Sequence, residues 1–248
     1  MSPIMIITGG SRGIGAATAR LAAQRGYAVW LTYRRDEESA LAVVRDIERA
    51  GGRAHAQPCD VRQEREVQHL FADVRSRWGV PAALVNNAGI TGMASRLDDA
   101  DAETMQAVID TNVMGPLFTC REAVRCMSTR HGGHGGSIVN VSSGAASIGS
   151  ADTYVWYAAS KAALDTVTLG LAREVAREGI RVNGVGLGFI DTEIHAAAGM
   201  PDRAQTLGPT LPIGRIGTPD EAAYAILWLH SKEASYVTGH TLRVAGGR

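Results

Sequence analysis

The sequence contains few cysteines: Cys59, Cys120 and Cys126 are the only thiols among 248 residues. Their odd number and irregular spacing fit neither a disulfide framework nor a metal or redox motif, and predict free, buried thiols in a reducing compartment. Long apolar runs are missing too. The run near the N-terminus, Ile4–Ile7, has four residues, which is too short for a signal peptide or a membrane span. We therefore expect a cytoplasmic protein that does not bind a membrane.

An excess of charge of either sign is also absent, because 25 basic residues balance 25 acidic ones. Nucleic acids and anionic membranes are recognised by basic surfaces, so this balance excludes the usual electrostatic signature of both. Lysine is the rare cation: Lys161 and Lys232 stand against 23 arginines. A lysine at a particular position therefore needs a chemical explanation.

What the sequence does contain is a regular alternation of short aliphatic runs with longer amphipathic segments. Hydrophobic residues make up 45% of the chain, which is enough for a substantial core. This alternation predicts a parallel sheet covered on both faces, in one doubly wound α/β domain over residues 1–248. The expected strands are Ile4–Ile7, Ala28–Thr32, Arg53–Gln57, Ala83–Asn86, Ser137–Val141, Arg181–Val185 and Thr241–Val244, and the expected helices lie near 13–25, 36–50, 64–78, 101–129, 155–178 and 219–230.

The segment 191–218 departs from this alternation. It contains several helix and strand breakers, namely Gly199, Pro201, Gly208, Pro209, Pro212 and Gly214. A long irregular insertion in a compact domain is usually functional, and we expect a lid over a substrate site. A plain surface loop is the alternative interpretation.

A glycine-rich turn follows the first expected strand and opens the first expected helix: Thr8-Gly9-Gly10-Ser11-Arg12-Gly13-Ile14-Gly15. Glycines allow a sharp turn and a close approach of the backbone to a diphosphate, while the helix N-terminus presents free N–H groups. The spacing differs from the common G-x-G-x-x-G, so the position between strand and helix is the stronger signal. The turn predicts a site for nucleotide phosphates.

From this turn onward the chain resembles the short-chain dehydrogenase/reductase family, whose motif is T-G-x-x-x-G-x-G. Further family motifs follow in order: Asp60-Val61, Asn86-Asn87-Ala88-Gly89, Asn112, Ser143, Tyr157-x-x-x-Lys161 and Tyr236-Val237-Thr238-Gly239. The resemblance implies a Rossmann-type sheet of about seven strands. It also implies an oxidoreductase that interconverts an alcohol and a carbonyl with a nicotinamide cofactor, similar to the 3-oxoacyl reductases and glucose dehydrogenases of the family.

The end of the second expected strand distinguishes the two nicotinamide cofactors. NAD enzymes place an acidic side chain there for the ribose 2′-hydroxyl, and NADP enzymes place arginine for the 2′-phosphate. Here Arg34 and Arg35 follow the strand, and Arg12 lies in the glycine turn. Asp36 is the rival, but it comes past the expected acidic position and is better placed to start the next helix. We therefore expect NADP(H).

The resemblance implies the remaining cofactor contacts. Asp60 and Val61 would flank the adenine, Ile190 would meet the nicotinamide carboxamide, and Thr192 would lie near the diphosphate. Leu187 replaces the proline that the family usually has before this last pair. The predicted cofactor-binding residues are Gly9, Ser11, Arg12, Gly13, Ile14, Gly15, Arg34, Asp60, Val61, Asn87, Ala88, Gly89, Tyr157, Lys161, Ile190 and Thr192.

Tyr157 and Lys161 lie four residues apart in an expected helix, so both side chains project from one face. Hydride delivery to a carbonyl leaves an alkoxide that needs a proton, which a phenol can supply. A free tyrosine has a pKa of about 10, and a positive charge about 4 Å away is sufficient to lower it by roughly 2–3 units. Lys161 and the oxidised cofactor would provide that charge.

A hydroxyl donor for the carbonyl oxygen should follow the strand Ser137–Val141. Ser142 and Ser143 both qualify, and we choose Ser143, which precedes Tyr157 by fourteen residues, one more than is usual in the family. Asn112 matches the residue that in this family holds a water beside the lysine. The predicted catalytic residues are Asn112, Ser143, Tyr157 and Lys161.

The residues around the expected site indicate a mostly apolar pocket for a small apolar or sugar-like substrate. Its expected lining is Ala145, Ile148, Leu187, Phe189, Ile194 and Met200, with Tyr154 and Trp156 narrowing the entrance. A 3-oxoacyl thioester is an alternative substrate: Arg130 suits an acidic carrier, whereas Glu178 has the wrong charge for one. A catalytically silent NADP(H)-binding regulator is the alternative from another class. No metal is expected, because His131 and His134 have no carboxylate or thiol partner in sequence.

Two expected helices, 101–129 and 155–178, carry apolar residues around most of their circumference. One face of each can pack on the sheet, but the other needs a further cover. Side by side they would form a self-complementary surface that a two-fold axis buries. The family resemblance implies a second interface near the C-terminus, so we expect a homotetramer.

Overall fold

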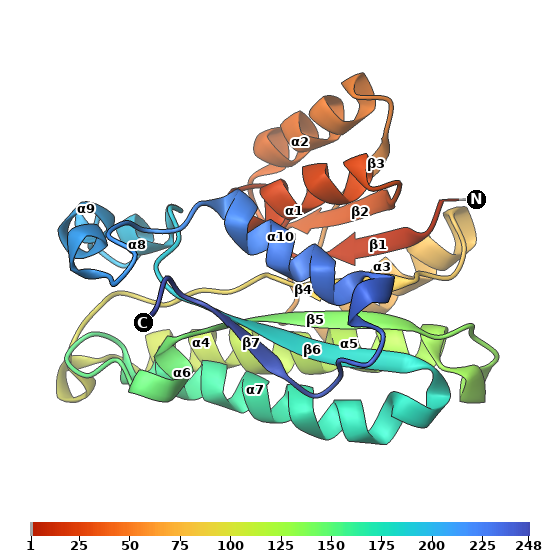
Figure 1. The fold of residues 1–248 in the computed structure, drawn as a ribbon. Helices are drawn as coiled ribbons and strands as arrows, with labels where there is room; N and C mark the ends of the chain where they lie inside the picture. The colour runs from red at the N-terminus through yellow and green to blue at the C-terminus, as the bar shows by residue number, and fades with distance from the viewer. Residues whose placement is uncertain (1) are drawn as a thin grey trace.

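Seven parallel strands form the centre of the protein, in the order β3-β2-β1-β4-β5-β6-β7 (Figure 1). A computed structural model describes residues 2–248. The strands are β1 Ile4–Ile7, β2 Ala28–Tyr33, β3 Arg53–Pro58, β4 Ala83–Asn86, β5 Gly136–Ser143, β6 Ile180–Leu187 and β7 Thr241–Val244. The order runs outward in both directions from the β1–β4 pair. This arrangement confirms the predicted doubly wound Rossmann-type sheet.

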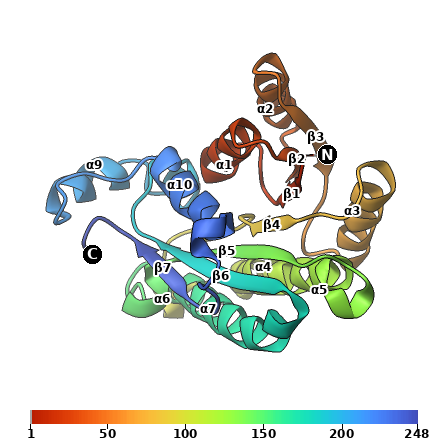
Figure 2. The same cartoon turned by 45° about the vertical axis from the view of Figure 1, so that its right-hand side comes forward.

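Helices cover both faces of the sheet, as the continuous apolar strands predict. On one face α1 (Gly13–Gln24), α2 (Glu37–Arg49) and α10 (Pro219–His230) pack over one cluster of buried residues. On the other face a second cluster lies beneath α3 (Glu64–Arg77), α5 (Gly115–Met127) and α7 (Val155–Val175). Figure 2 shows the two helical layers on opposite sides of the strands. None of the helices in residues 2–248 combines the length and apolarity that crossing a bilayer requires.

The prediction of a single helix over 101–129 is wrong in detail. The chain forms α4 (Ala102–Ile109), one π turn (Asp110–Met114) and then α5. Such π turns occur often at functional sites, and this one contains Asn112. The helix expected over 155–178 ends as an α-helix at Val175.

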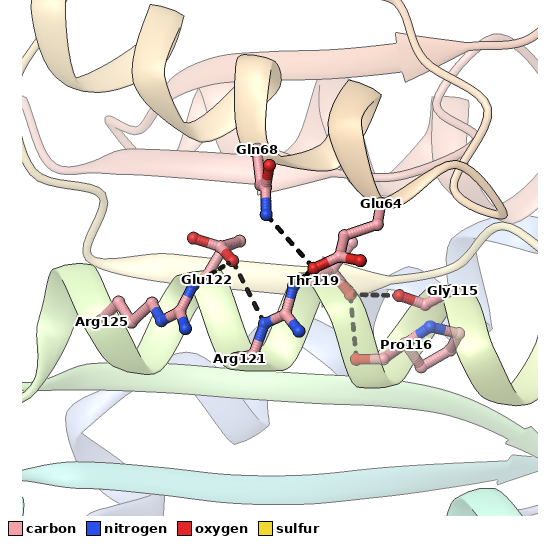
Figure 3. Close-up of polar contacts among 8 residues, drawn as sticks. All are labelled: Glu64, Gln68, Gly115, Pro116, Thr119, Arg121, Glu122 and Arg125. Atoms are coloured by element: carbon pink, nitrogen blue, oxygen red, sulfur yellow. Dashed lines mark hydrogen bonds and ion pairs between the residues drawn. The ribbon is translucent and has the colours of Figure 1, made fainter.

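Polar contacts fix α5 to its neighbours (Figure 3). Arg121 of α5 donates to Glu64 of α3 (Nη2···Oε1 2.5 Å) and to Glu122 on its own helix (Nε···Oε1 3.2 Å). The pair with Glu64 is exposed and contributes little stability by itself, whereas Glu122 is buried. On the buried side of the helix, the Thr119 hydroxyl donates to Asn86 Oδ1 at the end of β4 (2.6 Å). The start of α5 is therefore held against the carboxyl end of β4.

The segment 191–218 is more ordered than its breakers predict. It contains the short helices α8 (Ile194–Ala197) and α9 (Arg203–Leu207) and one 3-10 turn (Gly208–Thr210). A single bridge between Ile190 and Gly217 closes its base. In Figure 1 its helices project at the same end of the molecule as the label of the C-terminus.

Candidate active site

A cavity of about 1060 Å³ opens at the carboxyl ends of the central strands. In doubly wound sheets this is where ligands bind, because the strand order reverses there and the loops on either side diverge. The volume lies at the top of the range for one small ligand, so it has room for a nucleotide and a second molecule. Every predicted site residue except Gly15 and Asn112 lines this cavity.

The glycine turn between β1 and α1 lies on one wall of the cavity. Gly9 and Gly13 have φ of +64° and +50°, which side chains rarely adopt. A Cβ on Gly15 would lie 2.2 Å from the carbonyl oxygen of Gly9. Glycine is therefore required at all three positions. The turn leads directly into the first amides of α1, which have no acceptor within the helix and can bind an anion.

Asn87 connects this turn to the end of β4. Its side-chain Nδ2 donates to the carbonyl oxygens of Thr8 (3.0 Å) and Gly9 (2.8 Å). In return the Thr8 hydroxyl accepts from the backbone N–H groups of Asn87 (3.0 Å) and Ala88 (3.1 Å). The loop after β4 and the glycine turn therefore form one rigid unit, and Asn87 has a structural duty in addition to its place on the cavity wall.

A group of cations stands at the end of β2. Arg12, Arg34 and Arg35 all line the cavity. Burial lowers the pKa of Arg34, and the neighbouring charge of Arg35 lowers it further. Asp36 is occupied elsewhere: its carboxylate accepts from the backbone N–H of Ser39 (3.0 Å) and caps α2, as expected. The cations here thus exceed the available carboxylate, which favours a dianionic ligand group.

Asp60 and Val61 follow β3, which pairs with β2, and the Asp60 carboxylate lies near Arg34. The Asp60 carboxylate accepts from Nε of Arg62 (2.9 and 3.0 Å), and this bond holds its pKa below the usual value. Arg62 was not among the predicted residues. Because its guanidinium is committed to Asp60, it adds little free positive charge to the cavity.

Tyr157 and Lys161 project from one face of α7 into the middle of the cavity. Both are buried, and Lys161 Nζ lies 5.7 Å from the centroid of the Tyr157 ring. The ammonium donates to the carbonyl oxygen of Val141 (2.7 Å). Burial lowers the pKa of Lys161 to about 8. The lysine is therefore positioned by β5 as well as by its own helix.

The expected lowering of the tyrosine pKa depends on the oxidised cofactor as well as on Lys161, and the chain by itself does not produce it. Burial raises the pKa of Tyr157 to about 12, a hydrogen bond with Ser143 lowers it, and the nearby Tyr154 raises it. Desolvation has the largest effect on the pKa of Tyr157, because the Lys161 ammonium donates to Val141 rather than to the phenol. The chain alone therefore keeps the phenol protonated near neutral pH.

The structure distinguishes the two candidate serines. Ser143 lines the cavity together with Tyr157, and its hydroxyl lowers the pKa of that phenol. Ser142 is buried, and its hydroxyl donates to the carbonyl oxygen of Lys161 (3.3 Å). Ser143 thus has the geometry of a donor to a ligand, and Ser142 supports the helix that carries the lysine.

Asn112 lies behind the cavity wall, in the π turn. Its Oδ1 accepts from the N–H of Ile90 (2.9 Å), and its Nδ2 donates to the carbonyl oxygen of Ile90 (2.8 Å) and the hydroxyl of Ser160 (3.0 Å). Both N–H groups of its side chain are therefore engaged, and Oδ1 accepts one hydrogen bond, which fixes the orientation of the side chain.

The far end of the cavity contains residues that the sequence analysis missed. These are Arg203, Arg243, Arg248 and His195, and Tyr154, which was expected at the entrance, lines the cavity with them. Of the expected substrate pocket, Ala145, Ile148, Leu187, Phe189 and Ile194 also line it. Trp156 and Met200 do not: Trp156 is buried and donates to the carbonyl oxygen of Thr91 (2.8 Å), and Met200 packs in a neighbouring cluster. No group of metal-ligating side chains occurs in the described part of the chain.

The fold and this cavity define a Rossmann-type α/β protein with a tyrosine–lysine pair at its centre. A family model described as enoyl-(acyl carrier protein) reductase matches residues 9–248. The protein is 47% identical over 245 residues to an uncharacterized oxidoreductase YgfF from Escherichia coli, covering 99% of each chain. It is 41% identical over 247 residues to carbonyl reductase family member 4 from Danio rerio, covering 100% of this chain and 98% of the relative.

Among solved structures, a short-chain dehydrogenase from Burkholderia cenocepacia in complex with NADP aligns with a TM-score of 0.90 at 34% identity. The alignment covers 99% of this chain and 97% of that one. The protein belongs to the short-chain dehydrogenase/reductase family, and it is an oxidoreductase.

Proposed function

We propose that this protein is an NADP(H)-dependent oxidoreductase that interconverts a carbonyl and a secondary alcohol on a small substrate. One observation carries the proposal: Tyr157 and Lys161 on one face of α7, and Ser143 at the end of β5, share a cavity with a glycine turn built for phosphates. The NADP complex of the Burkholderia relative supports the choice of cofactor.

The residues present fit this cofactor. The strained glycines and free helix amides after β1 suit the diphosphate, and the arginines at the end of β2 suit the 2′-phosphate. Asp60 and Val61 would flank the adenine, while Ile190 and Thr192 would hold the nicotinamide end. When bound, NADPH supplies a hydride to the carbonyl carbon. Lys161 would hold the ribose hydroxyls of the nicotinamide half.

The side chains of this protein supply the proton. Ser143 would donate to the carbonyl oxygen and hold it beside the Tyr157 hydroxyl. Tyr157 then gives its proton to that oxygen as negative charge develops, which completes the alcohol. A phenol kept protonated by burial suits reduction, because the acid is ready when the carbonyl arrives. Alcohol oxidation needs the phenolate, and the charges of Lys161 and the oxidised cofactor would stabilise it.

The segment 191–218 would act as a lid over this cavity. Its residues Thr192, Glu193, Ile194, His195, Ala197 and Arg203 all line the cavity wall. A lid on short helices joined by glycine and proline can close over a substrate and exclude water.

A screen of ketones with NADPH tests the proposed activity. We expect about 1 equivalent of NADPH to be consumed for each alcohol formed, measured by absorbance at about 340 nm. The melting temperature of the protein should rise when NADPH is added. A protein that binds NADPH but reduces none of the ketones would support the silent regulator instead. Acetoacetyl coenzyme A belongs in the screen as a thioester. Arg130, the residue that favoured a carrier-bound substrate, does not line the cavity and faces Glu178 (4.0 Å).

The cofactor choice predicts that Arg34→Asp changes selectivity. Wild-type protein should bind NADPH at least tenfold more tightly than NADH, a difference of about 1.4 kcal/mol. The substitution should remove most of that preference and leave NADH binding nearly unchanged, because only the 2′-phosphate contacts the guanidinium. Titration calorimetry with both cofactors measures this. Arg65→Asp is the matched control, because Arg65 is exposed on α3 and does not line the cavity. Equal affinities in the wild type would contradict the assignment.

We also propose a homotetramer. On α5 and α7 the apolar side chains of Leu117 and Leu169 remain 39% and 41% exposed, and Tyr224 and Trp228 on α10 are 53% and 40% exposed. These are two separate apolar surfaces, as two interfaces require. The free thiols Cys59, Cys120 and Cys126 are all buried, which suits a cytoplasmic protein.

Placing a charge at Leu169 should split this assembly. Leu169→Glu would bury a carboxylate in the proposed α5–α7 interface, at a cost of several kcal/mol if it stays unpaired. Light scattering should then show a smaller particle. Leu41→Glu is the control, since Leu41 is 40% exposed on α2, outside both surfaces. A wild-type protein that is monomeric at micromolar concentration refutes the proposal.

A further inference from the structure

The lid end of the cavity holds a cluster of cations around one aromatic ring. The guanidinium carbons of Arg203 and Arg248 lie 5.6 Å and 4.9 Å from the centroid of the Phe189 ring. The ring of His195 lies 5.6 Å from the same ring. All four residues line the cavity. We call them the lid cluster.

The charge of the lid cluster has no counterion. Neither Arg203 nor Arg248 forms an ion pair within the described residues, although Arg215 in the same segment pairs with Glu221 (2.7 Å). The Nε of Arg203 is buried without a hydrogen-bond partner. A buried guanidinium donor costs stability unless something accepts from it, and a ligand anion can do so.

Neighbouring polar groups do not neutralise the positive charge of the lid cluster. Arg243 is committed, because it donates to the hydroxyl of Ser147 (2.9 Å) and the main-chain oxygen of Arg248 (3.1 Å). Asp191 acts on His195, where it raises the pKa, but burial and the charge of Arg203 outweigh it and lower that pKa overall. His195 is therefore neutral near pH 7, and its Nδ1 is buried without a partner. Glu193 is directed to the opposite side of the lid, toward Gly13.

The lid cluster lies close to the reacting tyrosine. Arg203 stands 5.5 Å from the ring centroid of Tyr154, whose centroid is 5.2 Å from that of Tyr157. One ring thus separates the proton donor from the Arg203 guanidinium, whose Nη1 donates to Sδ of Met200 (2.6 Å) and which has no carboxylate partner among the described residues. Ala145, Leu187 and Ile194 line the same cavity and give it apolar walls. The cavity therefore presents a proton donor, apolar walls and a cation within the length of one small molecule.

We propose that the substrate is an oxo acid: a ketone whose carboxylate binds the lid cluster, chiefly Arg203, while its carbonyl meets Tyr157 and Ser143. This rests on the proposed function and specifies its substrate class. In the reaction, a hydride leaves NADPH and forms a C–H bond at the carbonyl carbon as the C=O π bond breaks, and the Tyr157 O–H bond breaks to give the oxygen its proton. NADP⁺ is released and the Tyr157 phenolate regains a proton from solvent, so each turnover consumes one NADPH and one H⁺. The carboxylate is unchanged and serves only for binding. A planar guanidinium suits it because two parallel hydrogen bonds can form.

Matched pairs of acids and esters test the proposal. The pairs are 4-oxopentanoate, 5-oxohexanoate and 6-oxoheptanoate, each with its methyl ester, which keeps the ketone and removes the charge. We expect at least one acid to have a kcat/KM about tenfold or more above that of its ester, or about 1.4 kcal/mol. Arg203→Gln should reduce that ratio about tenfold, mainly through KM of the acid. Arg65→Gln should leave the ratio unchanged.

Each outcome has a separate meaning. If the esters are reduced as well as the acids, or if Arg203→Gln leaves the acid-to-ester ratio of kcat/KM unchanged, the lid cluster is not a carboxylate site. The reductase activity stands in either case. If acetoacetyl coenzyme A is reduced faster than every acid, the substrate is a thioester and the oxo-acid proposal is wrong. No turnover of any carbonyl compound defeats the proposed function itself. A thermal melt checks that Arg203→Gln folds. Arg248→Gln is a second variant, and it should also lower the acid-to-ester ratio of kcat/KM.

Discussion

Tyr157→Phe is expected to lower kcat by about 100-fold to 10,000-fold, the usual range for a general acid. The substitution removes one oxygen from a buried ring and leaves the packing of α7 in place. Ser143 lines the same cavity and can bind water where the phenolic oxygen was. Folding and NADPH affinity should therefore stay close to wild type, which separates a chemical role from a structural one. Stopped-flow turnover together with NADPH titration measures both.

Tyr154→Phe is the control for this experiment. Its ring packs edge-on against that of Tyr157 (5.2 Å) and is equally buried. It also loses one phenolic oxygen, yet it is not assigned the proton transfer. If Tyr157→Phe kept more than about a tenth of the wild-type kcat, the phenol would not be the acid.

Most of the fold follows from the local pattern of the sequence. The strands Ile4–Ile7, Ala83–Asn86 and Thr241–Val244 end where the sequence predicts, because each is a short aliphatic run bounded by breakers. Burial on both faces of a parallel sheet makes such runs continuous, so they are easy to recognise. Helix boundaries were harder to predict. Val113 and Met114 continue the apolar pattern of α4, and nothing in that periodicity shows the π turn Asp110–Met114.

The site was predictable where its residues are close in sequence. Tyr157 and Lys161 share a helix face, and the glycine turn is one segment. The lid cluster was not predictable from the sequence, because Phe189, Arg203 and Arg248 meet only after the chain has passed through the lid and β7. The pKa of Tyr157 in the chain alone could not be predicted for a similar reason. It depends on burial by the whole fold and on Lys161 bonding Val141, a residue 20 positions away.

Lys161→Arg is expected to abolish most turnover although it keeps a positive charge. The ammonium occupies a tight site: it donates to Val141 O at 2.7 Å, and a Cβ on Gly89 would stand 3.4 Å from it. Arginine is longer, planar and always charged, so it must displace this wall or leave the position beside the ribose and Tyr157. We expect kcat to fall by about 100-fold or more, as for the loss of a general acid–base partner. Unlike Tyr157→Phe, this change should also weaken NADPH binding, because the lysine would hold the ribose hydroxyls.

Lys232→Arg supplies the matched control, since Lys232 is the only other lysine of the sequence and is exposed at the end of α10. The same chemical change there should alter neither kcat nor the affinity for NADPH. Turnover and fluorescence titration of both variants measure the difference, with thermal melts to compare their stability. Should Lys161→Arg retain wild-type kcat, a positive charge of any shape would suffice. The compact ammonium between Val141 and Gly89 would then have no special part in the reaction.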